Sequence, residues 1–246
     1  MEKKVLATSY HTGGINAISP VIKRLNEEGK TDVVVISYKD AEKTFQSNHV
    51  GYRTIFDYGL KDVSVDSMKE LLKGESPDLI LTGQSCQDKD NKDAIDQTIT
   101  LAGKEKGIPT ISISDFWTGR VPYFSDIFSK NGKFKFLPDY ISVLDEIQKD
   151  IMIKEGFPED KLVITGNPHF DNLTFLRDNF SKEDLEQVRK DLNLGLDSYV
   201  LLYASQPVEF YYGSDSSNPK FLGYTEKTIL SDLINVLIKL SSSLII

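Results

Sequence analysis

The feature that most constrains the fold is an alternation of short β-rich runs with longer helical patterns over residues 1–165. This alternation is typical of βαβ units, whose strands lie parallel in one sheet with helices on both faces. In the first unit a run at 5–8 leads into a glycine loop, and apolar residues then recur at helical spacing over 15–25 until Gly29. The sequence therefore predicts an α/β domain built on a mainly parallel sheet.

Further elements follow in the same order. The run 32–37, DVVVIS, is almost wholly apolar, as expected of a strand that is covered on both faces. Residues 115–138 show no periodicity, and a loop of this length in a compact domain often carries function. Other strands are predicted at 78–82, 110–114, 140–144 and 162–165, and helices at 66–73, 93–106 and 146–155.

The pattern changes after Gly166. We expect residues 1–166 to form one full domain, and 167–246 to form an interdomain segment and the start of an incomplete second α/β domain, as a truncated product or an expressed fragment. A complete second domain would need on the order of 100 residues. The elements predicted there are helices at 173–179 and 182–192, a strand at 199–204, a loop or irregular hairpin at 206–223 and an apolar-striped helix at 225–240.

Composition narrows the class of protein. The 37 acidic and 29 basic residues give a net charge of -8 and are interspersed, which argues against nonspecific nucleic-acid binding. One cysteine, Cys86, allows no intrachain disulfide and no cysteine zinc cage. The histidines His11, His49 and His169 lack metal-ligand spacing, so we expect no metal and no cofactor. Without a signal-like or membrane-spanning apolar run, we expect a cytoplasmic protein with no integral membrane segment.

Four segments together resemble GT-B-fold proteins, which include many nucleotide-sugar glycosyltransferases and the UDP-N-acetylglucosamine 2-epimerases. They lie in the family's order at 10–25 (YHTGGINAISPVIKRL), 112–124 (SISDFWTGRVPYF), 138–173 and 200–207 (VLLYASQP). The run TGNPHFD at 165–171, directly after a predicted strand, is the most specific. The resemblance implies a Rossmann-like, acceptor-side N-terminal domain, and a cleft for a sugar nucleotide where the second domain begins. The late acidic residue and glycine-rich phosphate loop of the family's second half have no counterpart in the sequence.

The resemblance implies a glycosyltransferase that uses a nucleotide-sugar donor and a saccharide or lipid-linked acceptor in polysaccharide or glycoconjugate biosynthesis. A UDP-N-acetylglucosamine 2-epimerase is the nearest alternative. A noncatalytic sugar- or protein-binding module is the alternative from another class, and the final helix then suggests a homo-oligomer or a partner chain that completes the second domain.

Ligands of open α/β sheets gather at the carboxyl ends of the strands, where His11, Gly13 and Gly14 follow the first predicted strand. His11 is a candidate general base, because a histidine exchanges protons near neutral pH. The glycines would let a phosphate or sugar approach the helix N-terminus. The alternatives are a surface histidine and glycines that only make the turn.

Polar residues follow the next predicted strands. Gln84, Ser85 and Asp88 are candidates to bind sugar hydroxyls, or else ordinary loop caps. Within the irregular segment, Asp115 is an acidic candidate for the catalytic base, and Trp117 would stack on a sugar or base. Arg120 would hold a phosphate. The alternative there is a tryptophan that packs the loop and an ion pair between Asp115 and Arg120.

The remaining candidates lie near the predicted domain boundary. Asp145 follows a strand and would face the cleft, and the resemblance places Asn167 and His169 near the diphosphate. Asn167 would equally cap the next helix, with Pro168 at its first position. Ser205 and Gln206 follow the first predicted strand of the second domain and would face the same cleft.

Overall fold

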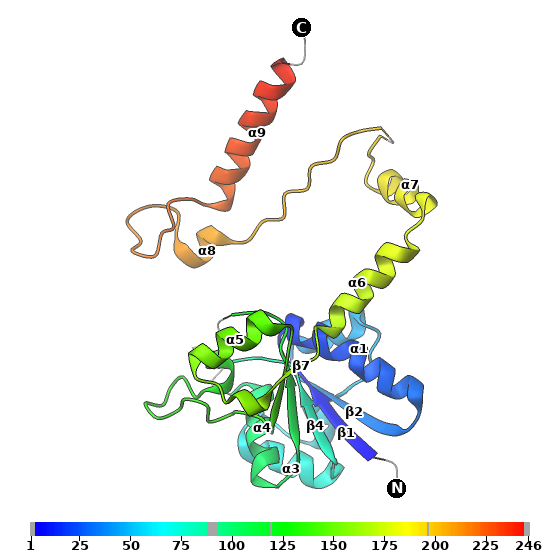
Figure 1. Ribbon diagram of the computed structural model, residues 1–246, viewed down its shortest axis with the longest axis vertical. Coiled ribbons are helices and arrows are strands. Elements are labelled where there is room, and N and C mark those ends of the chain that lie inside the picture. The colour runs from blue at the N-terminus through cyan, green and yellow to red at the C-terminus, as the bar shows by residue number, and fades with distance from the viewer. Residues whose placement is uncertain (1–2, 88–92, 119, 196, 244–246) are drawn as a thin grey trace. The chain divides into compact units, whose positions relative to one another are not determined.

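A computed structural model describes residues 3–87, 93–118, 120–195 and 197–243 of the chain. The chain forms two units, Met1–Phe180 and Ser181–Ile246. The first unit is a parallel β-sheet with helices around it, which confirms the predicted α/β class (Figure 1). The predicted domain boundary at residue 166 stays a prediction.

Seven strands within the described residues form one sheet in the order β3-β2-β1-β4-β5-β6-β7, and every neighbouring pair is parallel. Because all strands run the same way, their carboxyl ends lie at one edge of the sheet. The strand order reverses between β1 and β4, which is the position where open α/β sheets form a ligand-binding crevice. The strands are β1 (Lys3–Thr8), β2 (Thr31–Ser37), β3 (Arg53–Thr54), β4 (Leu79–Thr82), β5 (Thr110–Ile113), β6 (Tyr140–Val143) and β7 (Leu162–Ile164).

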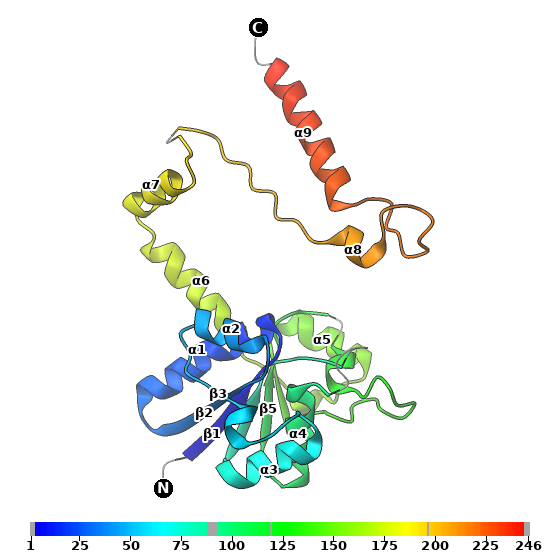
Figure 2. The ribbon, with the colours of Figure 1, turned by 180° about the vertical axis from the view of Figure 1, so that it is seen from behind.

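Helices pack on both faces of this sheet, with α1 and α2 on one face and α3 and α4 on the other (Figure 2). Helix α6 packs against α1. The helices of the first unit are α1 (Thr12–Glu28), α2 (Ala41–Ser47), α3 (Val65–Glu75), α4 (Ile95–Glu105), α5 (Glu146–Glu155) and α6 (Pro168–Asn179), with the short 3₁₀ helices η1 (Ile55–Tyr58), η2 (Val121–Phe124) and η3 (Glu159–Lys161).

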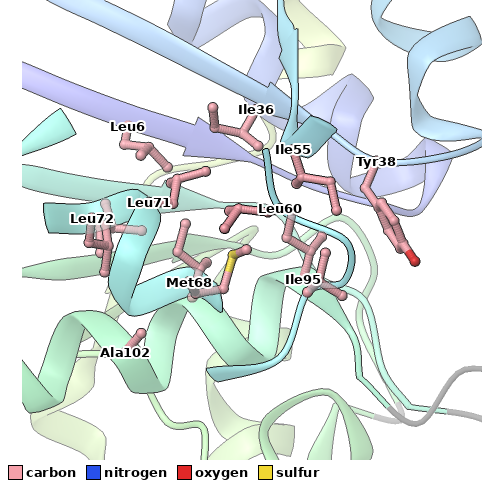
Figure 3. Packing of buried hydrophobic residues seen from close by; sticks show 13 residues of the cluster. Leu6, Ile36, Tyr38, Ile55, Leu60, Met68, Leu71, Leu72, Ile95 and Ala102 are labelled. Carbon is pink, nitrogen blue, oxygen red and sulfur yellow. The ribbon is translucent and has the colours of Figure 1, made fainter. Parts of the chain in front are cut away.

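Successive residues of β1 point to two different cores. Leu6 lies in the cluster formed with Met68 of α3 and Ile99 of α4, whereas Val5 and Ala7 pack on the α1 side. Figure 3 shows the first of these clusters, in which the α3 side chains point toward Leu6. The period of two along the strand is why a strand covered on both faces reads as a continuous apolar run.

The predicted helix boundaries are confirmed where a capping residue fixes them. Helix α1 ends at Gly29, which is left-handed with φ 62°, a conformation that glycine adopts without a Cβ clash. The side chain of Asn167 accepts a hydrogen bond from the His169 N–H, and Pro168 begins α6, so the capping interpretation of this turn is confirmed. Ser181 and Asp184 form a reciprocal capping box at α7.

Some elements differ from the sequence predictions. Helix α2 and the two-residue strand β3 were not predicted, because both are too short to show a clear period. The predicted strand at 199–204 is wrong. Those residues belong to no strand, and Tyr199 and Leu202 are exposed at 105% and 85%. A strand needs a neighbour to receive its backbone hydrogen bonds, and the described residues of the second unit supply none.

The second unit is helical, with α7 (Lys182–Asp191), α8 (Val208–Tyr212) and α9 (Glu226–Ser243). Helix α8 lies inside the predicted loop 206–223, and α9 confirms the predicted final helix. Many apolar side chains of α9 are exposed, including Ile229, Leu230 and Leu237. No helix among the described residues is both long and apolar enough to cross a membrane.

Candidate functional site

The loops after β1, β4, β5, β6 and β7 leave the sheet at its carboxyl edge. The predicted site residues of the first unit therefore come from five separate loops or helix starts that share one edge. Those within the described residues are His11, Gly13, Gly14, Gln84, Ser85, Asp115, Trp117, Arg120, Asp145, Asn167 and His169. Asp88 lies outside the described residues.

Arg120 joins the loop after β4 to the loop after β5. Its Nη1 donates to Asp115 Oδ1 at 2.9 Å and to Gln84 Oε1 at 2.7 Å, and its Nε donates to the Thr118 carbonyl at 2.9 Å. The guanidinium also lies over the Tyr123 ring, 4.6 Å from its centroid. Arg120 is only 4% exposed, so its bonding groups serve protein partners, and the predicted Asp115–Arg120 ion pair forms.

Asp115 extends from this ion pair to the start of α1. A Cβ built on Gly13 would lie 1.9 Å from Asp115 Oδ2, so the carboxylate fills the space that a side chain at residue 13 would need. The Asp115 carboxylate therefore lies against the first turn of α1, where the partial positive charge of a helix N-terminus favours an anion. Its side chain is still 21% exposed, which leaves it open to a ligand from outside.

Gly14 and His11 have separate roles at this edge. A Cβ on Gly14 would lie 2.4 Å from Ser9 Oγ and 2.8 Å from the Gln84 backbone nitrogen, so glycine there lets α1 approach the loop after β4. His11 occupies the N-cap position of α1 without a side-chain capping bond. Its ring packs edge-on against Tyr123 at a centroid distance of 6.3 Å.

Ser85 binds a buried acid that the sequence analysis missed. Its hydroxyl hydrogen-bonds to Asp96 in the first turn of α4, and the Tyr10 backbone N–H donates to the same oxygen, Oδ2. Asp96 is 4% exposed, and burial raises the pKa of its carboxyl. An acid in the first turn of a helix is common, so the sequence carries no signal that Asp96 is buried.

Trp117 connects α5 to α6. Its Nε1 donates to Asp145 Oδ2 at 2.7 Å, and Asp145 Oδ1 accepts from the Gln148 backbone N–H at the start of α5. Both bonds stabilise the carboxylate and lower the pKa of Asp145. The indole also stacks on Phe170 of α6, with ring centroids 6.3 Å apart. Trp117 thus packs the irregular loop onto the domain through Phe170, the residue after His169 in α6.

The predicted site residues Ser205 and Gln206 belong to the second unit. Ser205 Oγ donates to the Gln206 carbonyl, and Gln206 lines a pocket with Pro207 and Tyr211. That Ser205 and Gln206 face the same cleft as His11 stays a prediction. Among the residues that the structure describes, no three histidine, cysteine or acidic side chains form a group that could hold a metal ion.

No protein-family model matches the sequence, and no curated protein matches it. Several solved structures are similar to it in fold, at low sequence identity. A UDP-GlcNAc 2-epimerase from Neisseria meningitidis bound to UDP-GlcNAc is similar with a TM-score of 0.54 and 17% identity, over 79% of this chain and 55% of that chain. The fold is of the GT-B type.

Two further structures of this GT-B type agree. A UDP-N-acetylglucosamine 2-epimerase from Rickettsia bellii gives a TM-score of 0.51 at 16% identity, over 79% of this chain and 52% of that chain. A putative enzyme of the same name from Listeria monocytogenes gives 0.51 at 13% identity, over 76% and 51%. The chain thus spans about half the length of the GT-B structures that it matches, and the predicted resemblance of fold is confirmed.

Proposed function

We propose that the chain is a nucleotide-sugar enzyme that binds the sugar at the carboxyl edge of its sheet and uses Asp115 to accept a proton. The observation that carries this proposal is the setting of Asp115. One carboxylate oxygen is held by Arg120, and the other lies over Gly13 in the first turn of α1. A side chain fixed in this way loses little conformational freedom when it meets a substrate.

The burial and hydrogen bonding of the other acids at this edge support the assignment to Asp115. Asp96 is buried, and Asp145 bonds both Trp117 and the backbone of α5. In this set, Asp115 is the carboxylate that combines a partly exposed side chain with one oxygen that makes no hydrogen bond to the described residues. His11 remains the second candidate, since its half-buried ring lies at the same edge.

The reaction that we favour is epimerisation of a UDP-N-acetylglucosamine-like substrate. In such a reaction the base removes the proton from the carbon next to the anomeric carbon, and the C–H electron pair forms a double bond to the anomeric carbon as UDP departs with the C–O electron pair. Return of UDP to the anomeric carbon, with a proton added to the opposite face of the neighbouring carbon, gives the epimer. The fold likeness to solved UDP-GlcNAc 2-epimerases supports this choice of substrate class. A role in polysaccharide or glycoconjugate biosynthesis would follow from it.

Glycosyl transfer is the second candidate. Arg120 and the start of α1 are both engaged by Asp115, so Asp115 Oδ2 is better suited to a neutral sugar hydroxyl than to a phosphate. In a transferase the same carboxylate would accept the proton of an acceptor hydroxyl as that oxygen attacks the anomeric carbon, while the nucleoside diphosphate departs.

The test is to incubate the 246-residue chain with UDP-GlcNAc in D₂O and to follow the sugar proton next to the anomeric carbon by NMR. Epimerisation exchanges that proton for deuterium, whereas glycosyl transfer releases UDP only when a saccharide acceptor is added. We expect Asp115→Asn to lower the rate roughly 10²–10⁴-fold, the usual contribution of a general base.

Asp66→Asn is the matched control, because Asp66 is an exposed acid on α3. A rate for Asp115→Asn equal to that of Asp66→Asn would remove Asp115 from the reaction. Saturable binding of UDP-GlcNAc with neither reaction would favour the sugar-binding module, and the absence of both binding and reaction would refute the proposed function.

A further inference from the structure

Beneath the carboxyl edge, the Ser9 hydroxyl is buried without a hydrogen-bond partner among the described residues. So are Gln84 Nε2 and Asp96 Oδ1, on side chains whose residues are 2% and 4% exposed. Leaving such a group unpaired is unfavourable, so buried polar atoms nearly always find a partner in protein or ordered water. Gln84 and Asp96 line one small cavity of about 10 Å³ between β4, β5, α4 and η2.

The orientation of Gln84 follows from its neighbours. Arg120 is only a donor, so the oxygen of the Gln84 amide must face it, and Ser114 Oγ lies 3.4 Å from the same oxygen. The Nε2 group, with two N–H donors, must then lie on the other side of the amide. What Gln84 lacks is an acceptor.

The hydrogen bonds of Asp96 define its two oxygens. The Ser85 hydroxyl and the Tyr10 backbone N–H both bond to Oδ2, which leaves Oδ1 as the oxygen that carries a proton when the group is neutral. Burial raises the pKa of this carboxyl and so favours the neutral form. A protonated Oδ1 is a donor that makes no hydrogen bond among the described residues, and the buried Ser9 hydroxyl, which acts on the pKa of this carboxyl, is the acceptor that competes with the cavity for it.

We propose that this cavity binds one water molecule, which accepts hydrogen bonds from Gln84 Nε2 and Asp96 Oδ1 and joins the two side chains. A cavity of this size holds about one water, and a buried water typically makes about three hydrogen bonds. The hydroxyls of Thr82 and Ser112 line the same cavity and donate to the carbonyls of Ile111 and Gly83, so their oxygens can accept from the water.

This water connects the buried Asp96 carboxyl to the partly exposed Asp115 carboxylate through a series of side-chain contacts. It fixes the Gln84 amide, Gln84 orients Arg120, and Arg120 holds Asp115. The proposal concerns the interior of the domain and holds whichever ligand binds at the edge. Its test therefore needs no substrate, and its failure would leave the proposed function standing.

A crystal structure of the chain at a resolution that shows ordered water tests the site directly. We expect one water about 2.7–3.2 Å from both Gln84 Nε2 and Asp96 Oδ1. In solution, NMR cross-relaxation between water and the Gln84 side-chain amide should show a long-lived internal water. A dry cavity, or an Asp96 carboxyl turned to donate to Ser9 Oγ, would overturn the proposal.

Two variants give matched comparisons. Asp96→Asn keeps an oxygen for Ser85 and Tyr10 and offers N–H donors to the water, so the Gln84 cross-relaxation signal should remain. Asp96→Leu has similar volume but no polar atom, so the signal should be lost. If Asp96→Leu does not fold, the wild-type and Asp96→Asn spectra still decide, because absence of the signal in both refutes the water site.

Discussion

Substituting Gly13 by alanine tests whether the Asp115 carboxylate is held against the first turn of α1. In a helix, alanine is favoured over glycine by about 0.5–1 kcal/mol, so propensity alone predicts that Gly13→Ala stabilises the protein. The structure predicts the opposite. The new Cβ would lie 1.9 Å from Asp115 Oδ2 and 3.1 Å from its Cγ, so the carboxylate must move away.

The cost of that movement depends on Arg120. Removing the partner of a fully buried ion pair costs roughly 3–5 kcal/mol, and a hydrogen bond to a charged group contributes about 1.5–3 kcal/mol. Arg120 is buried, but the Asp115 side chain is 21% exposed and can find water, so we expect a loss of about 2 kcal/mol. Subtracting the helix propensity leaves Gly13→Ala destabilised by about 1 kcal/mol.

Urea unfolding gives the free energies of unfolding of four proteins: wild type, Gly13→Ala, Asp115→Ala and the double variant. In the Asp115→Ala background the clash is absent, so Gly13→Ala should stabilise by about 0.5–1 kcal/mol, and the sign of its effect reverses. Gly74→Ala in α3 is the matched control, because its Cβ meets no atom within 4 Å and it should stabilise in every background. If Gly13→Ala stabilises equally with and without Asp115, the contact does not hold Asp115 in place.

Two further predictions concern titration. Because burial raises the pKa of Asp96, its stabilising contribution is full below the unfolded value near 4 and is lost as pH rises through the folded value. Urea unfolding at several pH values should therefore show the free energy of unfolding of Asp96→Asn rising relative to that of wild type, by up to about 1.4 kcal/mol per pH unit above pH 4. Parallel pH dependences of the two proteins would refute this prediction. The titratable neighbours His11 and Tyr123 are the same in both proteins, so they do not cause the difference. Trp117→Phe removes one bond that lowers the pKa of Asp145, so NMR titration should show that pKa rise toward its usual value. An unchanged value would mean that the indole does not hold the carboxylate.

The sequence predicts the sheet well because the pattern that it reads is local. Alternating apolar runs and helical spacing identify β1, β2, β4, β5, β6 and β7, and Gly29 and Asn167 mark helix boundaries through their own backbone or side chain. A cap needs only the residues beside it, so it can be recognised in one dimension.

Prediction failed where a structure depends on distant partners. The run 199–204 has strand composition, but a strand forms only when another strand accepts its backbone bonds. Asp96 resembled any first-turn acid, and its burial follows from α4 packing on the sheet beside the Ser85 loop.

The sequence by itself determined that the strands run parallel and that the loops bearing His11, Gln84, Asp115 and Asp145 share one edge, since right-handed βαβ crossovers leave few other arrangements. Only the tertiary structure decided which of these side chains meet. Gly13 makes room for a carboxylate 102 positions away because α1 and the loop after β5 converge at the edge, and Arg120 turns inward because Gln84 and Asp115 lie within reach of one nitrogen. Such contacts depend on ångström-scale packing between elements, which no spacing along a single chain encodes.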